Sequence, residues 1–456
     1  MSINRLFVAN RGEIALRIVR AAQALNMETV VGVSDADRDS AAGRLADRVV
    51  VLGPAAAAKS YLDPALVVHA AKESGCDGLH PGYGFLSERA VLPRLCARHD
   101  IAFVGPDADV IDALGDKLRA RAMARAAGVP LVPGSEGIAS AADARREADR
   151  IGYPVLLKAS AGGGGRGMVI ANSADEAEAG FHRASAEAVA AFGDGRLFME
   201  RFVPEARHVE VQLMGDGKGQ VLHFGERDCS VQRRYQKLVE EAPCAAMPDH
   251  LRAQLHASAV ALAASVNYRN AGTAEFLFDV RRQEFYFIEV NARIQVEHPV
   301  SEMISGFDLV QEQLRIAGGA GLSIAQDQVS LSGHAIECRI NAEDVGRDFL
   351  PSPGRITRWR PPEGEGVRLD SHMAEGVMIP PYYDSMVGKL IVHAETRTAA
   401  IARLSEALEQ FEVEGVPTTI ALHRAIVAHP DFVENRIHTR WLEQVLLPEA
   451  MRAQAA

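Results

Sequence analysis

The sequence predicts a protein of several domains that combines α/β with α+β architecture, and three observations support this. The chain has 456 residues, enough for two to four domains. Its start alternates strand and helix patterns: residues 6–9 read as a buried strand, 12–25 as an amphipathic helix and 29–33 as a second strand. Residues 273–278 and 285–288 instead read as two strands of an antiparallel hairpin.

The first domain is predicted to be Rossmann-like. The strand-and-turn pattern of its start recurs at residues 80–84 and 101–105. The first turn reads Asn-Arg-Gly-Glu and lacks the G-x-G-x-x-G fingerprint, so the domain need not bind a dinucleotide. Turn residues near 128–135 and a new segment beginning near 331 suggest further boundaries. We expect domains at 1–113, 114–330 and 331–446.

Composition excludes several classes of function. The formal net charge of −11, without a basic run, argues against a nucleic-acid partner. No segment has the pattern of a signal peptide or the apolar length of a membrane span. Five scattered cysteines without C-x-x-C spacing fit a reducing compartment, so we expect a cytoplasmic protein with no membrane association.

The most informative stretch is residues 284–299. After the alternating apolar strand, five polar residues follow at intervals of two: Glu289, Asn291, Arg293, Gln295 and Glu297. In an extended chain these side chains would emerge on one face. A straight strand would separate Glu289 from Glu297 by about 26 Å, so a site shared by both requires the chain to bend after Asn291. A solvated edge strand is the alternative, but the flanking aromatic residues favour a position inside a sheet. The pattern therefore favours a functional site.

The preceding strand supplies a second carboxylate. With a turn centred near Arg282, Glu275 falls directly opposite Glu289. Like charges in that position destabilise a sheet unless a cation lies between them. Two carboxylates and the Asn291 amide are hard oxygen ligands, which suit Mg²⁺ bridging to phosphates rather than zinc. Only seven lysines occur in the chain, so those within motifs, such as Lys117, Lys158 and Lys237, are candidates for specific roles.

A glycine run joins two predicted strands. Residues 158–168 read Lys-Ala-Ser-Ala-Gly-Gly-Gly-Gly-Arg-Gly-Met. Residues without side chains let backbone N–H groups approach phosphate oxygens closely. No Gly-Lys-Ser/Thr follows, so this is not a Walker A loop, and a flexible linker is the alternative. The strands on both sides and Lys158 favour phosphate binding, with the loop forming part of a mobile lid over about residues 130–203.

Seven motifs together resemble the biotin carboxylase family of the ATP-grasp superfamily. They span most of the chain from about residue 4 to 445: residues 9–15, 80–88 (HPGYGFLSE), 158–168, 226–243 (ERDCSVQRRYQKLVEEAP), 289–299, 333–344 (GHAIECRINAED) and 381–389 (PYYDSMVGK). The resemblance implies a Rossmann-like N-terminal domain, an ATP-grasp domain with a mobile lid and a C-terminal α+β domain.

The resemblance also implies roles for matching residues. The implied ATP-binding residues are Lys117, Lys158, Gly162, Gly163, Gly164, Gly165, Gly167, Met168, Glu200, Val203, His208, Gln232, Glu275 and Glu289. Glu275, Glu289 and Asn291 match the ligands of Mg²⁺ or Mn²⁺, two ions per site. The bicarbonate and biotin pocket is matched by Lys237, Arg293, Gln295, Val296, Glu297, Arg339 and Tyr83, among which Arg293, Glu297, Lys237 and Arg339 would be catalytic.

The implied activity is ATP- and bicarbonate-dependent carboxylation of biotin through carboxyphosphate. Glu297 would remove the proton of bicarbonate, and Arg339 would stabilise the biotin enolate. Tyr235 stands where the family pattern has a histidine, which puts any imidazole contact there in doubt. The alternatives are an inactive nucleotide-binding paralogue and another ATP-grasp ligase, such as a carbamoyl-phosphate synthetase half. Intact Lys237, Arg293, Gln295, Glu297 and Arg339 argue against the first alternative. Residues 293–297 together with Arg339 favour biotin over the substrates of another ligase.

The resemblance further implies partners. The chain lacks a Met-Lys-Met biotinylation signature and ends soon after the third predicted domain. We therefore expect biotin to be carried by a separate biotin carboxyl carrier protein, with a separate carboxyltransferase subunit, in an acetyl-CoA or propionyl-CoA type carboxylase. A homodimer is also expected. Which acyl-CoA or oxo acid receives the carboxyl group is left open.

Overall fold

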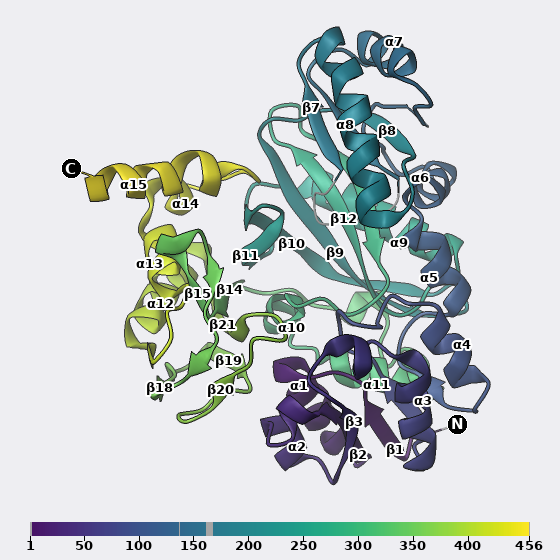
Figure 1. Ribbon diagram of the computed structural model, residues 1–456, viewed down its shortest axis with the longest axis vertical. Coiled ribbons are helices and arrows are strands. Elements are labelled where there is room, and N and C mark those ends of the chain that lie inside the picture. Colours follow the sequence, from purple (N-terminus) through teal and green to yellow (C-terminus); the bar gives the residue numbers. More distant parts are fainter. Residues whose placement is uncertain (1, 136, 161–166, 456) are drawn as a thin grey trace.

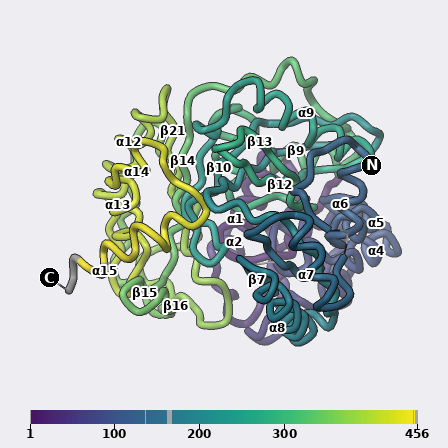
Figure 2. Tube along the Cα trace, turned by 90° about the horizontal axis from the view of Figure 1, so that it is seen from above, coloured from purple at the N-terminus to yellow at the C-terminus, as the bar shows by residue number. Residues whose placement is uncertain are grey.

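The computed structural model describes residues 2–135, 137–160 and 167–455. Figure 1 shows an N-terminal region at the bottom, a central sheet, a helical cap at the top and a C-terminal region at the left. The view turned by 90° in Figure 2 again places the C-terminal region beside the central strands. The predicted combination of α/β and α+β architecture is confirmed. Among the described residues, no helix has the length and apolar character needed to cross a membrane.

The N-terminal region contains a five-stranded parallel sheet in the order β3-β2-β1-β4-β5. Apolar residues of β1 are fully buried, as the sequence pattern predicted. Helix α1 begins at Gly12, whose φ of +70° is a left-handed conformation that suits glycine. The elements are β1 (Arg5–Val8), α1 (Gly12–Ala24), β2 (Glu28–Ser34), α2 (Ala41–Leu45), β3 (Arg48–Gly53), α3 (Pro64–Glu73), β4 (Gly78–His80), α4 (Val91–Ala97), β5 (Ala102–Phe103) and α5 (Ala108–Gly115).

The central and C-terminal regions share one eight-stranded sheet in the order β13-β12-β9-β10-β11-β14-β21-β19. Its central part contains β9 (Ala206–Asp216), β10 (Val221–Arg233), β11 (Gln236–Ala242), β12 (Arg269–Asp279) and β13 (Glu284–Asn291). Helix α9 (Asp249–Ser265) buries Leu255 and Ala259 against apolar residues of β9 and β12. The helices α6 (Lys117–Ala126), α10 (His298–Ser305) and α11 (Leu309–Ala317) complete this region.

Within the predicted lid range, the described residues form a separate antiparallel sheet in the order β7-β6-β8, which two helices cover (Figure 1). Small residues of α8, including Ala177 and Ala184, pack closely against Leu157 and Val169 of the sheet. The elements are α7 (Ala141–Ile151), β6 (Val155–Ala159), β7 (Met168–Ala171), α8 (Ala174–Phe192) and β8 (Leu197–Arg201).

The C-terminal region extends the large sheet through β14, which pairs with β11 on one side and β21 on the other. Its core packs apolar residues of these strands against Leu404 and the fully buried Trp441. The larger elements are β14 (His334–Asn341), β19 (Val367–Ser371), β21 (Met386–Ala394), α12 (Arg397–Gln410), α13 (Ile420–Ala428), α14 (Pro430–Val433) and α15 (Leu447–Ala455). Short paired strands surround them: β15 (Glu343–Asp344), β16 (Leu350–Pro351), β17 (Gly354–Arg355), β18 (Arg358–Arg360), β20 (Met378–Ile379) and β22 (Glu412–Glu414).

Candidate active site

A cavity of about 1170 Å³ lies where the three regions meet. That volume can hold a nucleotide together with a second small substrate. Sixteen predicted site residues line it: Tyr83, Lys117, Lys158, Met168, Glu200, Val203, His208, Gln232, Lys237, Glu275, Glu289, Asn291, Arg293, Gln295, Val296 and Arg339. Gly162, Gly163, Gly164 and Gly165 fall outside the described residues. Gly167 is described and precedes β7 with a φ of +67°, a left-handed conformation.

The hairpin prediction is confirmed in its register. Strands β12 and β13 pair antiparallel, and Glu275 lies directly opposite Glu289. Each carboxylate has a basic neighbour: Lys117 Nζ lies 3.0 Å from Glu289, and His208 Nε2 lies 3.0 Å from Glu275. The Asn291 amide donates to Glu275 at 2.8 Å. These residues form a compact set of hard oxygen donors at one end of the hairpin.

The bend that a shared site requires after Asn291 is confirmed, so the five polar residues do not lie along one straight strand. Strand β13 ends there, and the chain turns before α10 begins at His298. The turn is held by side chains: Glu88 accepts a hydrogen bond from the Ala292 backbone N–H at 3.1 Å and from Arg293 Nε at 2.9 Å. The bend brings Glu297 back toward the hairpin, as a shared site requires.

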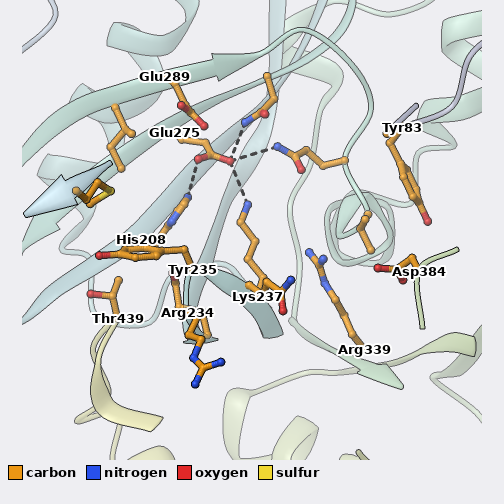
Figure 3. A pocket seen from close by; sticks show the side chains of 18 of the residues that line it. Tyr83, His208, Arg234, Tyr235, Lys237, Glu275, Glu289, Arg339, Asp384 and Thr439 are labelled. Atoms are coloured by element: carbon orange, nitrogen blue, oxygen red, sulfur yellow. Dashed lines mark hydrogen bonds and ion pairs between the residues drawn. The ribbon is translucent and has the colours of Figure 1, made fainter. Parts of the chain in front are cut away.

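Lys237 on β11 forms ion pairs with three carboxylates of the site. Its ammonium lies 2.5 Å from Glu210, 3.1 Å from Glu275 and 2.6 Å from Glu297. Glu297 itself is fully buried behind the residues that line the cavity. Figure 3 shows the side chain of Lys237 pointing toward Glu275, with Glu289 beside it. Each of these carboxylates also has a second basic partner, which is Arg227 for Glu210, His208 for Glu275 and Arg339 for Glu297.

The charges of this cluster shift the pKa values of its members in opposite directions. Burial alone would raise the pKa of Glu297, but Lys237 and Arg339 outweigh it and hold that pKa well below its usual range. Burial likewise opposes the charge of Lys237, yet Glu210, Glu275 and Glu297 raise its pKa well above the usual value. Glu297 is therefore an ionised carboxylate at neutral pH and Lys237 a permanent cation.

Arg339 on β14 approaches the same carboxylate from the other side. Its guanidinium lies 2.9 Å from Glu297 and 2.6 Å from Glu240. Burial raises the pKa of Glu240 to about 7, although Arg339 opposes the shift. Tyr83, Arg339 and Asp384 lie on one side of Lys237 in Figure 3, opposite His208 and Tyr235.

The predicted nucleotide side contains a second buried ion cluster. Lys158 on β6 lies 2.9 Å from Glu200 on β8, and Arg121 of α6 contacts the other oxygen of the same carboxylate. Val203, 9% exposed, follows Glu200 along the wall of the cavity. Gln232 donates to the Cys229 carbonyl at 2.9 Å and is almost fully buried. The exposed Tyr235 lies at the rim with a φ of +65°.

Sequence reasoning missed two buried residues beneath the site, Glu210 and Arg227. Glu210 links Lys237 to Arg227, whose Nε lies 2.7 Å from it. Both side chains are fully buried. A signal was present: His208, Glu210 and Gln212 alternate with apolar residues along β9, which is the period of a strand with one polar face. Arg121 gave no comparable signal, since it lies in a helix rich in arginine and alanine.

The site fits a divalent metal ion bound with a nucleotide. Glu275, Glu289 and Asn291 are the residues that would hold it, because their oxygen donors converge at one end of the hairpin. Lys117 and His208 occupy that end now and compensate the negative charge. A further group of possible ligands is His208, Glu210 and Glu275, but Arg227 and Lys237 already occupy both oxygens of Glu210.

Family models match almost the whole chain. The biotin carboxylase N-terminal domain matches residues 2–111, the ATP-binding domain of the carbamoyl-phosphate synthase L chain matches 116–325, and the biotin carboxylase C-terminal domain matches 337–444.

Curated relatives and solved structures agree with these models. A biotin carboxylase of Nostoc sp. is 49% identical over 98% of this chain and 100% of its own length, and biotin carboxylase 1 of Bacillus subtilis is 47% identical over 97% and 98%. The crystal structure of the biotin carboxylase of Campylobacter jejuni with a β,γ-ATP complex superposes with a TM-score of 0.94 at 44% identity, covering 97% of this chain and 99% of that one. The chain belongs to the biotin carboxylase family, a family of ATP-dependent ligases.

Proposed function

We propose that this protein carboxylates biotin borne on a separate carrier protein, using ATP and bicarbonate and passing through carboxyphosphate. The observation that carries the proposal is the position of Glu297. It is a buried, ionised carboxylate clamped between Lys237 and Arg339, beside a hairpin suited to a metal–nucleotide complex. Glu297 as general base, Lys237 and Arg339 as cations, and the metal- and phosphate-binding end of the hairpin thus meet at one cavity.

In the first step, Glu297 accepts the proton of bicarbonate while a bicarbonate oxygen attacks the γ-phosphorus of ATP. The new P–O bond forms as the bond to the β-phosphate oxygen breaks, so ADP leaves and carboxyphosphate remains. Lys237 and Arg293 would hold the anion, and Gln295 and Val296 would form the wall beside it. A carboxylate held so strongly by cations is a weak base, but the incoming anion competes for Lys237 and thereby raises the pKa of Glu297.

In the second step, carboxyphosphate separates into CO₂ and phosphate, and phosphate takes the N1′ proton of biotin. The ureido nitrogen then bonds to CO₂. Arg339 would stabilise the negative charge on the ureido oxygen, and Tyr83 would line the biotin side of the cavity. Since Arg339 and Lys237 both contact Glu297, the bicarbonate and biotin positions are neighbours in this scheme.

On the nucleotide side, Lys117, Lys158 and the glycine run would bind the phosphates. Glu200 and Val203 would contact the adenine edge, and His208 and Gln232 would make further contacts with the nucleotide. A bound Mg²⁺ or Mn²⁺ would neutralise charge on the transferred phosphoryl group. His208 and Lys117 would exchange their carboxylate partners for phosphate oxygens when the nucleotide enters. Both side chains line the cavity, where an incoming nucleotide can reach them.

The setting of the reaction is part of the proposal. We infer a carrier protein and a carboxyltransferase as partners in an acetyl-CoA or propionyl-CoA type carboxylase, a homodimeric state and a cytoplasmic location. The domain limits 1–113, 114–330 and 331–446 are retained as proposed boundaries. In support of a multi-component setting, one relative from Methanothermobacter thermautotrophicus, 44% identical, is named as one of the subunits of pyruvate carboxylase.

Reconstituted turnover tests the proposal. The purified protein is expected to cleave ATP at its full rate only when Mg²⁺, bicarbonate and biotin are all present, because the base and the acceptor are needed for consecutive steps. Phosphate release should be followed after each component is omitted in turn, with ¹⁴C-bicarbonate tracing the carboxyl group into biotin. An equal rate of ATP cleavage without bicarbonate would exclude this function.

The metal-binding hairpin yields a separate prediction. Replacing Glu275 or Glu289 by glutamine should weaken binding of the metal–ATP complex, since one carboxylate of the facing pair is removed while its volume is kept. Nucleotide affinity titrated at increasing Mg²⁺ measures the effect. Exposed Glu73 of α3 offers a matched Glu→Gln control. Wild-type metal dependence in either hairpin variant would remove that residue from the proposed ligand set.

A further inference from the structure

Lys389 is a buried cation that the proposed reaction does not use. It lies on β21, and its side chain is fully buried. Its ammonium donates to the backbone carbonyl of Val296 at 2.9 Å and lies 3.2 Å from a carboxylate oxygen of Glu13. Asp370 follows at 3.9 Å. Lys389 is not among the described residues that line the cavity, so it reaches the site only through what it contacts.

Glu13 connects this cation to Tyr83, a second residue that lines the cavity. The same oxygen of Glu13 that faces Lys389 accepts a hydrogen bond from the phenol of Tyr83. A continuous chain of contacts therefore runs from Tyr83 through Glu13 and Lys389 to the Val296 carbonyl. Its two ends line the cavity on the proposed biotin side and the proposed bicarbonate side. Its members come from α1, the turn after β4, β21 and the turn before α10.

The charge of Lys389 is stabilised by its carboxylate neighbours despite its burial. A buried ammonium is costly unless compensated, and burial alone would lower the pKa of Lys389. Glu13, Glu337 and Asp370 outweigh the burial and raise that pKa, so Lys389 is charged at neutral pH. A charged donor on the Val296 carbonyl fixes the orientation of that peptide group more strongly than a neutral donor would. The neighbouring residues Gln295 and Glu297 are thereby held in place.

We propose that Lys389 is a positioning residue that sets the bicarbonate-binding turn at Val296 and couples it to Tyr83 through Glu13. This inference rests on the proposed function, since it assigns a role within the same site. The alternative is that Lys389 only stabilises the junction of the domains. Such a residue would affect folding and all substrates alike, whereas a positioning residue affects bicarbonate selectively.

The decisive experiment measures substrate dependence in Lys389→Met. The KM for bicarbonate is expected to rise at least about tenfold, the order expected for loss of a charge-assisted hydrogen bond. The Kd for ATP, measured without bicarbonate, should stay within about twofold of the wild type, because Lys389 contacts none of the described residues proposed to bind the nucleotide. Lys72→Met, at an exposed position of α3, is the matched control. An unchanged bicarbonate KM, or an equal loss of affinity for bicarbonate and ATP, would overturn the proposal.

Tyr83→Phe keeps the test decisive should Lys389→Met fail to fold, because it removes a single oxygen atom. The coupling predicts a higher bicarbonate KM in this variant in addition to any effect on biotin. Where both variants fold, their effects on the bicarbonate KM should be less than additive, as expected for members of one network. A normal bicarbonate KM in Tyr83→Phe would show that Tyr83 is not coupled to the bicarbonate-binding turn. Wild-type turnover that requires bicarbonate and biotin is established first, so failure of the coupling is separable from failure of the proposed function.

Discussion

Glu297→Gln is expected to reduce bicarbonate-dependent turnover by about 10²–10⁴-fold, the usual cost of losing a general base. Glutamine keeps the volume and can still accept hydrogen bonds, but it cannot take the proton. Nucleotide affinity should stay close to the wild type, since Lys237 retains Glu210 and Glu275 as partners. Steady-state phosphate release together with the Kd for ATP measures both quantities on the same preparation.

A matched substitution separates this effect from a general one. Glu73→Gln, on the exposed face of α3, makes the same chemical change far from the cavity lining and should leave turnover unchanged. If Glu297→Gln turned over at a near-normal rate, the base would have to be another group. Glu297 would then be a structural carboxylate that compensates Lys237 and Arg339.

Lys237→Met is expected to affect both activity and stability. Three buried carboxylates lose their shared cation, and breaking a buried ion pair typically costs about 3–5 kcal/mol. Turnover should fall by about 10²–10³-fold, as for removal of one preorganised donor to a reacting anion. Chemical denaturation and steady-state kinetics provide the two measurements, with Lys72→Met as the control for loss of a lysine charge.

The stability loss in Lys237→Met should depend on pH in a defined direction. In the wild type Lys237 lowers the pKa values of Glu275 and Glu297, so these groups favour the folded state above their unfolded pKa values. Without the cation their folded pKa values rise, so ionisation of these carboxylates favours the folded state less than in the wild type. The difference in unfolding free energy between wild type and variant should therefore be largest near neutral pH and shrink as the carboxylates become protonated in acid. A difference independent of pH would mean that Lys237 stabilises the fold by packing alone.

The hairpin shows how much the sequence could determine. Alternation of apolar residues sets which side chains share a face, and turn length sets the register, so the facing of Glu275 and Glu289 could be predicted. Beyond Asn291, period-two spacing alone cannot distinguish a continued strand from a turn, and the bend could be predicted only from the length that a straight strand would have between Glu289 and Glu297. The contacts that bend the chain come from Glu88, which is about two hundred residues away.

The buried network beneath the cavity marks a second limit. Roles for Lys237 and Arg339 could be inferred from motifs, but their shared attachment to Glu297 depends on the pairing of β11 with β14. Partners such as Arg227 and Arg121 are specified by packing in three dimensions, which no local pattern records. Arginine is also abundant in this chain, so its occurrence at a special position is hard to recognise from composition.

The continuous eight-stranded sheet has a consequence for how the protein can be divided. Lys237 and Arg339 belong to regions on either side of residue 330, yet their strands β11 and β14 are hydrogen-bonded neighbours. Adjacent strands lie about 4.8 Å apart, so the backbone ladder itself sets the separation of the two cations. A fragment cut between these regions would expose a long unpaired strand edge on each half, a template for aggregation. The proposed boundary at residue 330 therefore separates two regions that share one sheet.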